Sequence, residues 1–265
     1  MRNYKIPTLT IAGSDSSGGA GVQADLKTFS AIGTYGMSVI TAITAQNTQG
    51  VFLVEELSED IIRKQIEVVF EDIEPKAVKI GMVSSSRIVE VIVESLAHYK
   101  PKYLVVDPVM ISKSGYSLLR KEAKKSLIEE LIPMAYIITP NTLEAEEIVG
   151  IKINTIDDMK EAGKKILELG PKYVLMKGGH LEGDAVDVLI GKETFEIYKQ
   201  ERLDRKNTHG TGCTLSSAIA SHLALGYEIR EAVKLSKEYI TEAIRHSFDI
   251  GQGVGPVNHF YKFEE

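Results

Sequence analysis

The chain has 265 residues, of which 43% are hydrophobic and 26% are charged, so its composition is that of a folded globular protein and excludes a disordered chain. The formal net charge of −6 argues against a nucleic-acid-binding surface. Cys213 is the single cysteine, which excludes an internal disulfide, and no apolar run reaches the ~18 residues that a membrane span requires. The apolar stretch after residues 1–5 is too short for a signal peptide, and we expect a cytoplasmic protein.

Apolar runs and helical patterns alternate along most of the chain. Residues 8–12 predict a strand that ends in a glycine loop over residues 13–21. Further short, β-rich runs predict strands at residues 77–80, 103–106, 136–138 and 173–176. Helical spacing of apolar residues predicts helices around residues 62–73 and 88–96, and another from about Asp157 to a stop at Gly170 and Pro171. Such an order is typical of a parallel sheet with crossover helices.

A hairpin and two helices complete the predicted architecture. Residues 186–190 and 194–198 are β-type runs joined by residues 191–193, which predicts a hairpin at one edge of the sheet. Helical patterns follow over about 211–225 and 228–245. Without a linker or repeat, residues 1–265 are expected to form a single α/β domain, with a mostly parallel central sheet and helices on both faces. Ligands of such sheets bind beyond the carboxyl ends of the strands.

Small, polar and charged residues follow the predicted strands. They are the loop 13–21, residues 81–82, residues 107–110, residues 139–141 and residues 177–180. Each segment alone is explained by turn chemistry, since Gly, Pro, Asn and Asp dominate loops. Together they would lie at one edge of the sheet, and we expect the functional site there.

Residues 207–213 form a glycine-rich turn that leads into a helix of small and apolar residues. Unpaired amides and the positive end of the helix dipole make such a helix start an anion site. The chain has no G-x-x-x-x-G-K-[ST] motif and no convincing G-x-G-x-x-G, so a P-loop enzyme and a dinucleotide-binding protein are both disfavoured. Cys213 would lie at this helix start, where the pKa of a thiol is expected to fall. The spacing of His180, His209 and the other histidines supports no zinc site.

Seven motifs in order resemble the hydroxymethylpyrimidine and phosphomethylpyrimidine kinases of thiamine biosynthesis, in the ribokinase-like superfamily. They are TIAGSDSSGGAGVQADLKTF at residues 10–29, TAQNT at 44–48, KIGM at 79–82, VVDPVM at 105–110, ITPN at 138–141 with Glu144, LMKGGH at 175–180, and KNTHGTGCTLS at 206–216. The resemblance spans nearly the whole chain. It implies a three-layer ribokinase-like fold and transfer of a phosphoryl group from ATP to the pyrimidine alcohol and to its monophosphate.

The resemblance also assigns roles at the site of phosphoryl transfer. The amides of Gly210, Thr211, Gly212 and Cys213 would hold the moving phosphoryl group, as preorganised donors do in other enzymes. Cys213 stands where much of the superfamily has an Asp that acts as a base, and its base role here is a hypothesis. The residues implied in binding ATP and Mg²⁺ are Lys177, Asn141 and Thr208 for the nucleotide, and Asp107 and Glu144 for the metal, through waters.

Gln46 is the residue that points to the substrate. Its amide can donate to a ring nitrogen and accept from the adjacent exocyclic amine of an aminopyrimidine. By resemblance, the pocket around the pyrimidine would include Ala20, Met82, Val109 and Asp25. Two departures from the family pattern, Ser16 in the glycine loop and Met37 in place of a common Cys, leave these motifs intact.

Three other functions remain open on the sequence. A pyridoxal or pyridoxine kinase of the same Cys-bearing branch would share the fold, Lys177 and Cys213, and dual activity is compatible with the motifs. A non-catalytic nucleotide sensor would show no phosphoryl transfer, and a dinucleotide oxidoreductase would bind nicotinamide. We expect small-molecule partners only, with no nucleic acid and no membrane, and a homodimer by analogy with the relatives.

Overall fold

The computed structural model describes residues 6–110 and residues 121–264, the latter apart from His180 and Glu182. The predictions for His180 and for residues 1–5 therefore lie outside the described residues. The strands are β1 (Pro7–Asp15), β2 (Tyr35–Asn47), β3 (Gly50–Glu56), β4 (Ala77–Ile80), β5 (Leu104–Val106), β6 (Ile137–Ile138), β7 (Tyr173–Lys177), β8 (Ala185–Gly191) and β9 (Thr194–Gln200). The α-helices are α1 (Gly21–Ile32), α2 (Glu59–Asp72), α3 (Ser86–Tyr99), α4 (Lys121–Ser126), α5 (Thr142–Val149), α6 (Ile156–Leu167), α7 (Thr211–Ala224) and α8 (Ile229–Arg245).

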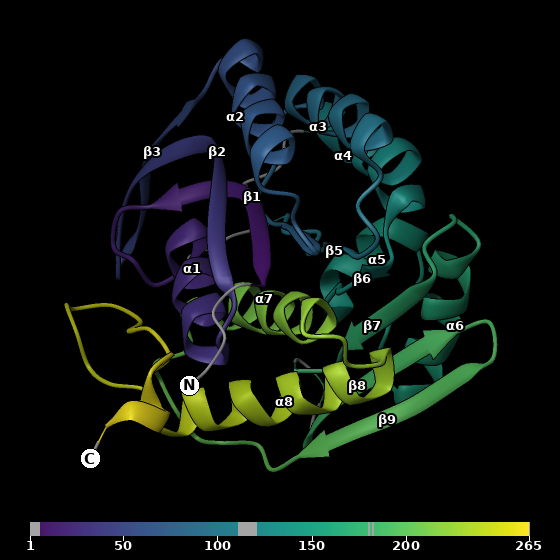
Figure 1. Ribbon diagram of the computed structural model, residues 1–265. Helices are drawn as coiled ribbons and strands as arrows, with labels where there is room; N and C mark the ends of the chain where they lie inside the picture. Colours follow the sequence, from purple (N-terminus) through teal and green to yellow (C-terminus); the bar gives the residue numbers. More distant parts are fainter. Residues whose placement is uncertain (1–5, 111–120, 180, 182, 265) are drawn as a thin grey trace.

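The described strands form one nine-stranded sheet in the order β3-β2-β1-β4-β5-β6-β7-β8-β9 (Figure 1). The six strands from β2 to β7 in this order are parallel, and the two edges are antiparallel. The chain crosses to opposite sides of β1 when it forms β2 and later β4, so a topological switch point lies beside β1. The parallel sheet and the edge hairpin β8–β9 confirm the predicted fold class.

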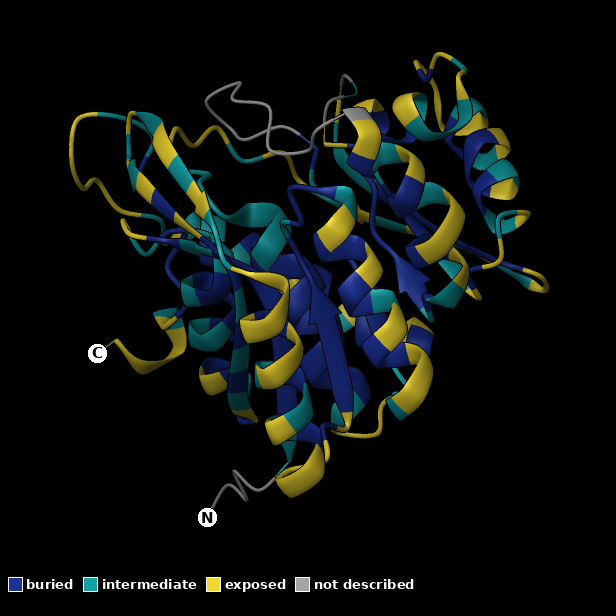
Figure 2. Ribbon diagram, turned by 90° about the horizontal axis from the view of Figure 1, so that it is seen from above, coloured by how far each residue is buried: buried dark blue, intermediate teal, exposed yellow. Residues whose placement is uncertain are grey.

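Helices cover both faces of the sheet. One apolar core lies between the sheet and α2, α3 and α6, and a second lies between the sheet and α1, α7 and α8. Figure 2 shows the strands between these layers as buried and the outward helix surfaces as exposed. Unbroken apolar strands such as β4, whose four residues are all buried, are required because both faces of the strand are covered.

The second edge of the sheet was not predicted. No strand was expected over residues 35–56, where the structure has β2 and the antiparallel β3. Their signal is weak because much of their apolar surface faces outward, as shown by Phe52 and Leu53, which are 68% and 63% exposed. Strand β1 also extends to Asp15, past the predicted end at residue 12, because Ser14 and Asp15 pair with β2 after a bulge.

Within the described ranges, no helix combines the length and the hydrophobicity needed to cross a membrane.

Candidate active site

The first turn of α7 meets the loop between β1 and α1. Gly210 is the N-cap of α7 with φ 79°, and a side chain there would collide with the carbonyl oxygen of Gly19. The hydroxyl of Thr211 donates a hydrogen bond to the carbonyl oxygen of Thr208, with 2.8 Å between the two oxygens. In the described part of the chain no side chain caps the helix. The turn therefore combines tight backbone packing with a helix start whose amides are open to an anion.

Lys177, at the end of β7, lies between the carboxylate of Asp107, which follows β5, and that of Glu144, in the first turn of α5. Its Nζ is 2.9 Å from Asp107 Oδ1 and 3.9 Å from Glu144 Oε2. Asp107 follows β5 and is 1% exposed, and it also accepts from Thr139 and Ser216. Burial opposes ionisation of Asp107, but the charges of Lys177 and Lys79 outweigh it and lower its pKa. The structure thus brings together the residues predicted for phosphate and metal.

Lys177 and Asp107 also reach the start of α7. A Cβ added at Gly212 would lie 3.4 Å from Asp107 Oδ2 and 3.5 Å from Lys177 Nζ. The cation, the carboxylate and the helix N-terminus therefore share one small space, and a side chain at residue 212 would enter it.

Glu144 is held in place by a capping box at the start of α5. Asn141 Oδ1 accepts from the amide of Glu144, and Glu144 Oε2 accepts from the amide of Asn141. Burial raises the pKa of Glu144 to about 7, with the charge of Asp107 adding to the effect and Lys177 opposing it. Asn141 therefore orients Glu144 through the backbone, and its side-chain oxygen is already engaged.

A second buried ion pair lies close to this space. Lys79 Nζ is 2.9 Å from both carboxylate oxygens of Asp25, and both side chains are 0% exposed. Asp25 also accepts from Thr10 at 2.6 Å and from Ser217 at 2.7 Å. Asp25, which was predicted to belong to the substrate pocket, has its carboxylate buried in the core with its oxygens used by three neighbours, and its part in binding the substrate stays a prediction.

The pKa of Cys213 also differs from what its position predicted. The thiol is half-buried in the first turn of α7, and its pKa is raised to about 11, not lowered. Burial is the main cause, the charges of Asp25 and Asp107 add to it, and Lys79 opposes it. At pH 7 the side chain is a neutral thiol.

Of the residues predicted to bind the pyrimidine, Gln46 lies beside this turn. Gln46, near the end of β2, has its amide nitrogen 3.2 Å from Nε2 of His209, the residue before Gly210. His209 Nε2 is also 2.9 Å from Asp15 Oδ2. The other predicted pocket residues, Ala20, Met82 and Val109, are all half-buried. Met82 Sδ lies near Gly13, 3.1 Å from where a Cβ would stand, and Val109 follows Asp107 directly.

The sequence analysis assigned no role to Asp15, His209 or Lys79. Lys79 had a readable signal, since a lysine inside an otherwise apolar strand of a buried sheet needs a charged partner. Asp15 and His209 had none, because their contact joins residues 194 positions apart.

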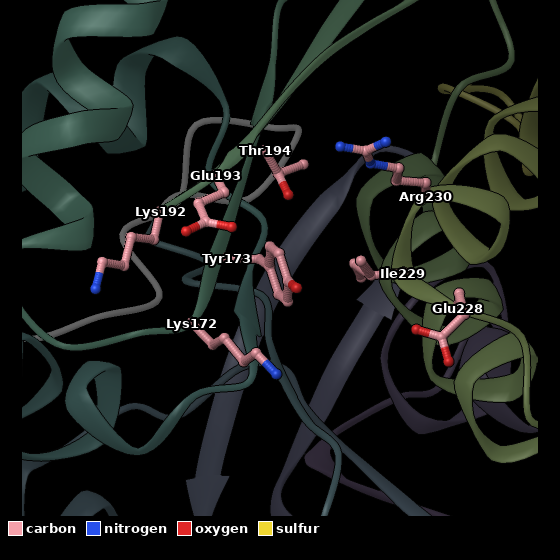
Figure 3. Close-up of a pocket in the computed structure, with 8 residues that line it drawn as sticks. All are labelled: Lys172, Tyr173, Lys192, Glu193, Thr194, Glu228, Ile229 and Arg230. Atoms are coloured by element: carbon pink, nitrogen blue, oxygen red, sulfur yellow. The ribbon is translucent and has the colours of Figure 1, made fainter.

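A cavity of about 490 Å³ lies at the opposite end of the sheet (Figure 3). It is lined by Lys172 and Tyr173 at the start of β7, by the β8–β9 turn and by the start of α8. Figure 3 shows lysine, arginine and glutamate side chains around this cavity. It is remote from the carboxyl ends of the strands and from the groups described above. Among the described residues, no three His, Cys, Asp or Glu side chains converge as a metal-binding group.

Comparisons with known proteins agree with this geometry. The chain is 47% identical to a hydroxymethylpyrimidine/phosphomethylpyrimidine kinase of Streptomyces coelicolor over 97% of its own length and 95% of that protein. It is also 47% identical to the thiamine biosynthesis bifunctional protein ThiED of Geobacter sulfurreducens, where it spans 97% of its own length but only 53% of that protein.

Solved structures give the same picture. A phosphomethylpyrimidine kinase from Clostridium difficile is 72% identical, with a TM-score of 0.83 over 91% of this chain and 100% of that one. An ADP complex of Bacillus subtilis pyridoxal kinase is 43% identical, with a TM-score of 0.89 over 96% and 97%. The family model described as phosphomethylpyrimidine kinase matches residues 15–258. With the ribokinase-like fold and the site at its sheet edge, these matches show that the chain belongs to the phosphomethylpyrimidine kinase family of phosphotransferases.

Proposed function

We propose that this protein transfers the γ-phosphoryl group of ATP to the hydroxymethyl group of 4-amino-5-hydroxymethyl-2-methylpyrimidine, and then phosphorylates the resulting monophosphate to the diphosphate, in thiamine biosynthesis. The observation that carries the proposal is the meeting of Lys177, Asp107 and the N-terminus of α7 around Gly212. A cation and a set of backbone amides, held next to a buried carboxylate, are what phosphoryl transfer needs, since it depends on alignment and charge neutralisation. The names of the relatives support the choice of acceptor.

The first turn of α7 is proposed to hold the transferring phosphoryl group. Gly210 lets the backbone approach the β1–α1 loop, and the amides of Gly212 and Cys213 are left for the ligand, with no partner found in the described residues. Lys177 is proposed to contact the ATP phosphates, where its charge offsets the negative charge of the transferring group. Removal of such a preorganised donor typically costs ~10²–10³ in rate.

Asp107 and Glu144 are proposed to hold Mg²⁺. Two carboxylates close to a space open to phosphate oxygens match the oxygen donors that Mg²⁺ prefers, with the substrate completing the shell. Burial, with a smaller contribution from the charge of Asp107, raises the pKa of Glu144 to about 7, and a bound divalent cation would favour its ionised form. When bound, the ion neutralises phosphate charge. Asn141 orients Glu144 through the capping box, and Thr208 supports the turn that precedes the anion site.

Cys213 as general base stays a prediction. In the free protein the thiol keeps its proton at pH 7, because its pKa is about 11. In a loose transition state the attacking hydroxyl loses its proton late, so the neutral thiol is proposed to act first as a hydrogen-bond partner that orients this hydroxyl. Gln46 is proposed to read the aminopyrimidine edge, with Ala20, Met82 and Val109 as the apolar walls.

Pyridoxal is the second candidate acceptor. The similarity to the Bacillus subtilis pyridoxal kinase, at a TM-score of 0.89, favours it specifically. The same anion site and the same Lys177 would serve either alcohol. The difference between the two substrates lies at the ring, where the amide of Gln46 matches the paired ring nitrogen and amine of the pyrimidine.

Acceptor choice is tested by ADP release from Mg-ATP with the aminohydroxymethylpyrimidine, its monophosphate and pyridoxal. Turnover of both pyrimidines is expected. Turnover of pyridoxal alone would replace the proposal with the second candidate, and no turnover with any of the three would contradict both. The Lys177→Gln variant is the matched control, since any ADP release that survives at full rate in this variant comes from a contaminating enzyme.

Three further predictions accompany this function. The continuous sheet supports a single domain over residues 1–265. We also propose a homodimer, which sedimentation would test, and a location in the cytoplasm, where ATP is available.

A further inference from the structure

The side-chain amide of Gln46 lies between two polar groups that hold it from opposite sides. Its Nε2 is 3.2 Å from His209 Nε2, and its Oε1 is 3.2 Å from Thr44 Oγ1. The two ends of an amide have nearly the same shape, so rotation by 180° exchanges them without disturbing the packing. The hydrogen bonds of the neighbours therefore decide which end faces which group.

Thr44 favours the nitrogen of Gln46 on its side. A hydroxyl has one proton to donate, and Thr44 Oγ1 lies 2.9 Å from the carbonyl oxygen of Ser14, which can only accept. With its proton committed there, the Thr44 oxygen is left as an acceptor. The atom of Gln46 that faces it must then be the donor, which is Nε2.

His209 favours the oxygen of Gln46 on the other side. Its Nε2 is 2.9 Å from Asp15 Oδ2, which also accepts from the amide of Ala20. Burial of Asp15 opposes ionisation, but hydrogen bonds from His209 and Ser17 hold its pKa down at about 2. A carboxylate only accepts, so His209 Nε2 carries a proton. A protonated Nε2 has no lone pair with which to accept from an amide nitrogen. The Gln46 atom beside it must therefore be Oε1.

We propose that Asp15, His209 and Thr44 fix the order of donor and acceptor on the amide of Gln46, which makes His209 and Thr44 specificity-determining residues for the heterocycle. The oxygen of Gln46 faces His209, and its nitrogen faces Thr44. One N–H on the side of Thr44 and one oxygen lone pair on the side of His209 then remain for a ligand. The inference rests on the proposed function, in which Gln46 reads the substrate.

A fixed order distinguishes two heterocycles of equal shape. An aminopyrimidine offers a ring-nitrogen acceptor beside an amine donor, whereas its 4-oxo analogue offers a ring N–H donor beside a carbonyl acceptor. The hydroxymethyl group must face the N-terminus of α7 for transfer, so the ring cannot turn over to correct a mismatch. A Gln46 amide that is locked accepts the amino compound and rejects the oxo compound, because a mismatch leaves buried polar groups unpaired.

The test compares kcat/KM for the aminohydroxymethylpyrimidine and its 4-oxo analogue. In wild type the amino compound is expected to be strongly preferred. His209→Phe keeps a ring over Gly19 but removes the Nε2 proton, and Thr44→Val keeps the branched shape but removes the hydroxyl. Each change is expected to reduce the amino-to-oxo ratio by about tenfold, the effect of one hydrogen bond.

Two control variants separate orientation from general loosening of the pocket. Ser16→Ala removes the contacts of Ser16 Oγ with the backbone of Gln46, at 2.8 and 2.9 Å, without touching the amide end, and Thr44→Ser keeps the hydroxyl. Both are expected to leave the ratio as in wild type. If His209→Phe and Thr44→Val lower the two kcat/KM values equally, so that the ratio stays constant, the inference is overturned.

A second measurement does not depend on turnover. The ¹⁵N chemical shifts of the His209 ring report which nitrogen carries a proton, and Nε2–H is expected in wild type. A ring with an unprotonated Nε2 would accept from the amide nitrogen and contradict the inferred order. If wild type fails to phosphorylate the pyrimidine while Nε2–H is observed, the proposed function fails and the inferred order of the amide stands.

Discussion

Cys213 is subject to two opposing effects at a single residue. The N-terminus of a helix stabilises a thiolate by about 0.3–1 kcal/mol. That is less than the ~1.4 kcal/mol that corresponds to one pKa unit. Burial, together with Asp25 and Asp107, therefore outweighs the helix and the charge of Lys79, and the pKa rises to about 11. The position in the helix alone predicted the wrong direction.

Alkylation of Cys213 is expected to be slow at neutral pH. Because the thiolate is the nucleophile and forms only as the pH approaches about 11, the rate with iodoacetamide should keep rising above pH 9. Mass spectrometry can follow the reaction without ambiguity, since Cys213 is the single cysteine of the chain. Glutathione in the same buffers is the reference. If the alkylation rate of Cys213 levels off at a pH no higher than that at which the rate of glutathione levels off, the pKa of the Cys213 thiol is not raised.

At the scale of elements, α7 has a glycine with positive φ next to each end. Gly210 at the N-cap has φ 79°, and Gly226 beyond the C-terminus has φ 92°. They differ in their surroundings, because a Cβ at Gly210 would collide with the backbone of Gly19, whereas one at Gly226 would meet nothing within 4 Å. The pair separates the cost of the backbone conformation from the cost of close packing.

Gly226→Ala is expected to lower the free energy of unfolding by about 1–2 kcal/mol, the cost of the left-handed conformation for a residue with a Cβ. Gly210→Ala should cost more and should also abolish turnover, because the first turn of α7 must move away from the β1–α1 loop. Thermal unfolding and ADP release measure the two effects. Equal stability losses with turnover retained in both variants would mean that the contact with Gly19 is not needed.

At the scale of the whole molecule, the Lys79–Asp25 pair joins a strand of the sheet to two helices of the layer that covers it. Lys79 comes from β4 in the sheet, Asp25 from α1, and Ser217, which donates to Asp25, from α7. Removing one partner of such a pair leaves an uncompensated charge in the core. The pair therefore ties the helices that border the site to the sheet that carries Lys177 and Asp107.

Lys79→Met is expected to reduce the free energy of unfolding by about 3–5 kcal/mol. The double variant Lys79→Met, Asp25→Asn should recover part of this loss, because no buried charge remains unpaired. Urea denaturation measures both. Lys199→Met, which breaks an exposed ion pair with Asp184, is the matched control and should change little. A double variant less stable than Lys79→Met alone would count against the argument.

Two buried histidines make the fold sensitive to acid. Burial lowers the pKa of His222 and of His259 to about 4, below the value near 6.5 expected in the unfolded chain. Between these values the unfolded chain binds more protons, so stability is complete above pH 6.5 and falls as the pH drops toward 4. At pH 5 each histidine should cost about 2 kcal/mol. Melting temperatures from pH 7 to 5 should fall less steeply in the His222→Gln, His259→Gln double variant; an unchanged slope would assign the effect to other groups.

Five of the six parallel strands, β1 and β4 to β7, and the glycine turn before α7 could be predicted from the residues alone. Strands β4 to β7 are covered on both faces, so their residues must be apolar, and their short unbroken runs are readable. The glycine turn before α7 was readable because a helix start that leaves amides free has a local signature. The family motifs supplied the positions of Lys177, Asp107 and Glu144, which the structure brings together at one edge of the sheet.

The second sheet edge, the state of Cys213 and the surroundings of Asp25 could not be predicted, because they depend on contacts that form on folding. Strand β3 has no buried residue, and in β2 the alternation of buried residues covers only the first part of the strand. Asp25 and Lys79 lie 54 positions apart, and His209 and Asp15 lie 194 apart. A pKa or a hydrogen-bond direction depends on burial and on charges brought together by folding, and these are properties of distances in space that a linear order of residues does not contain.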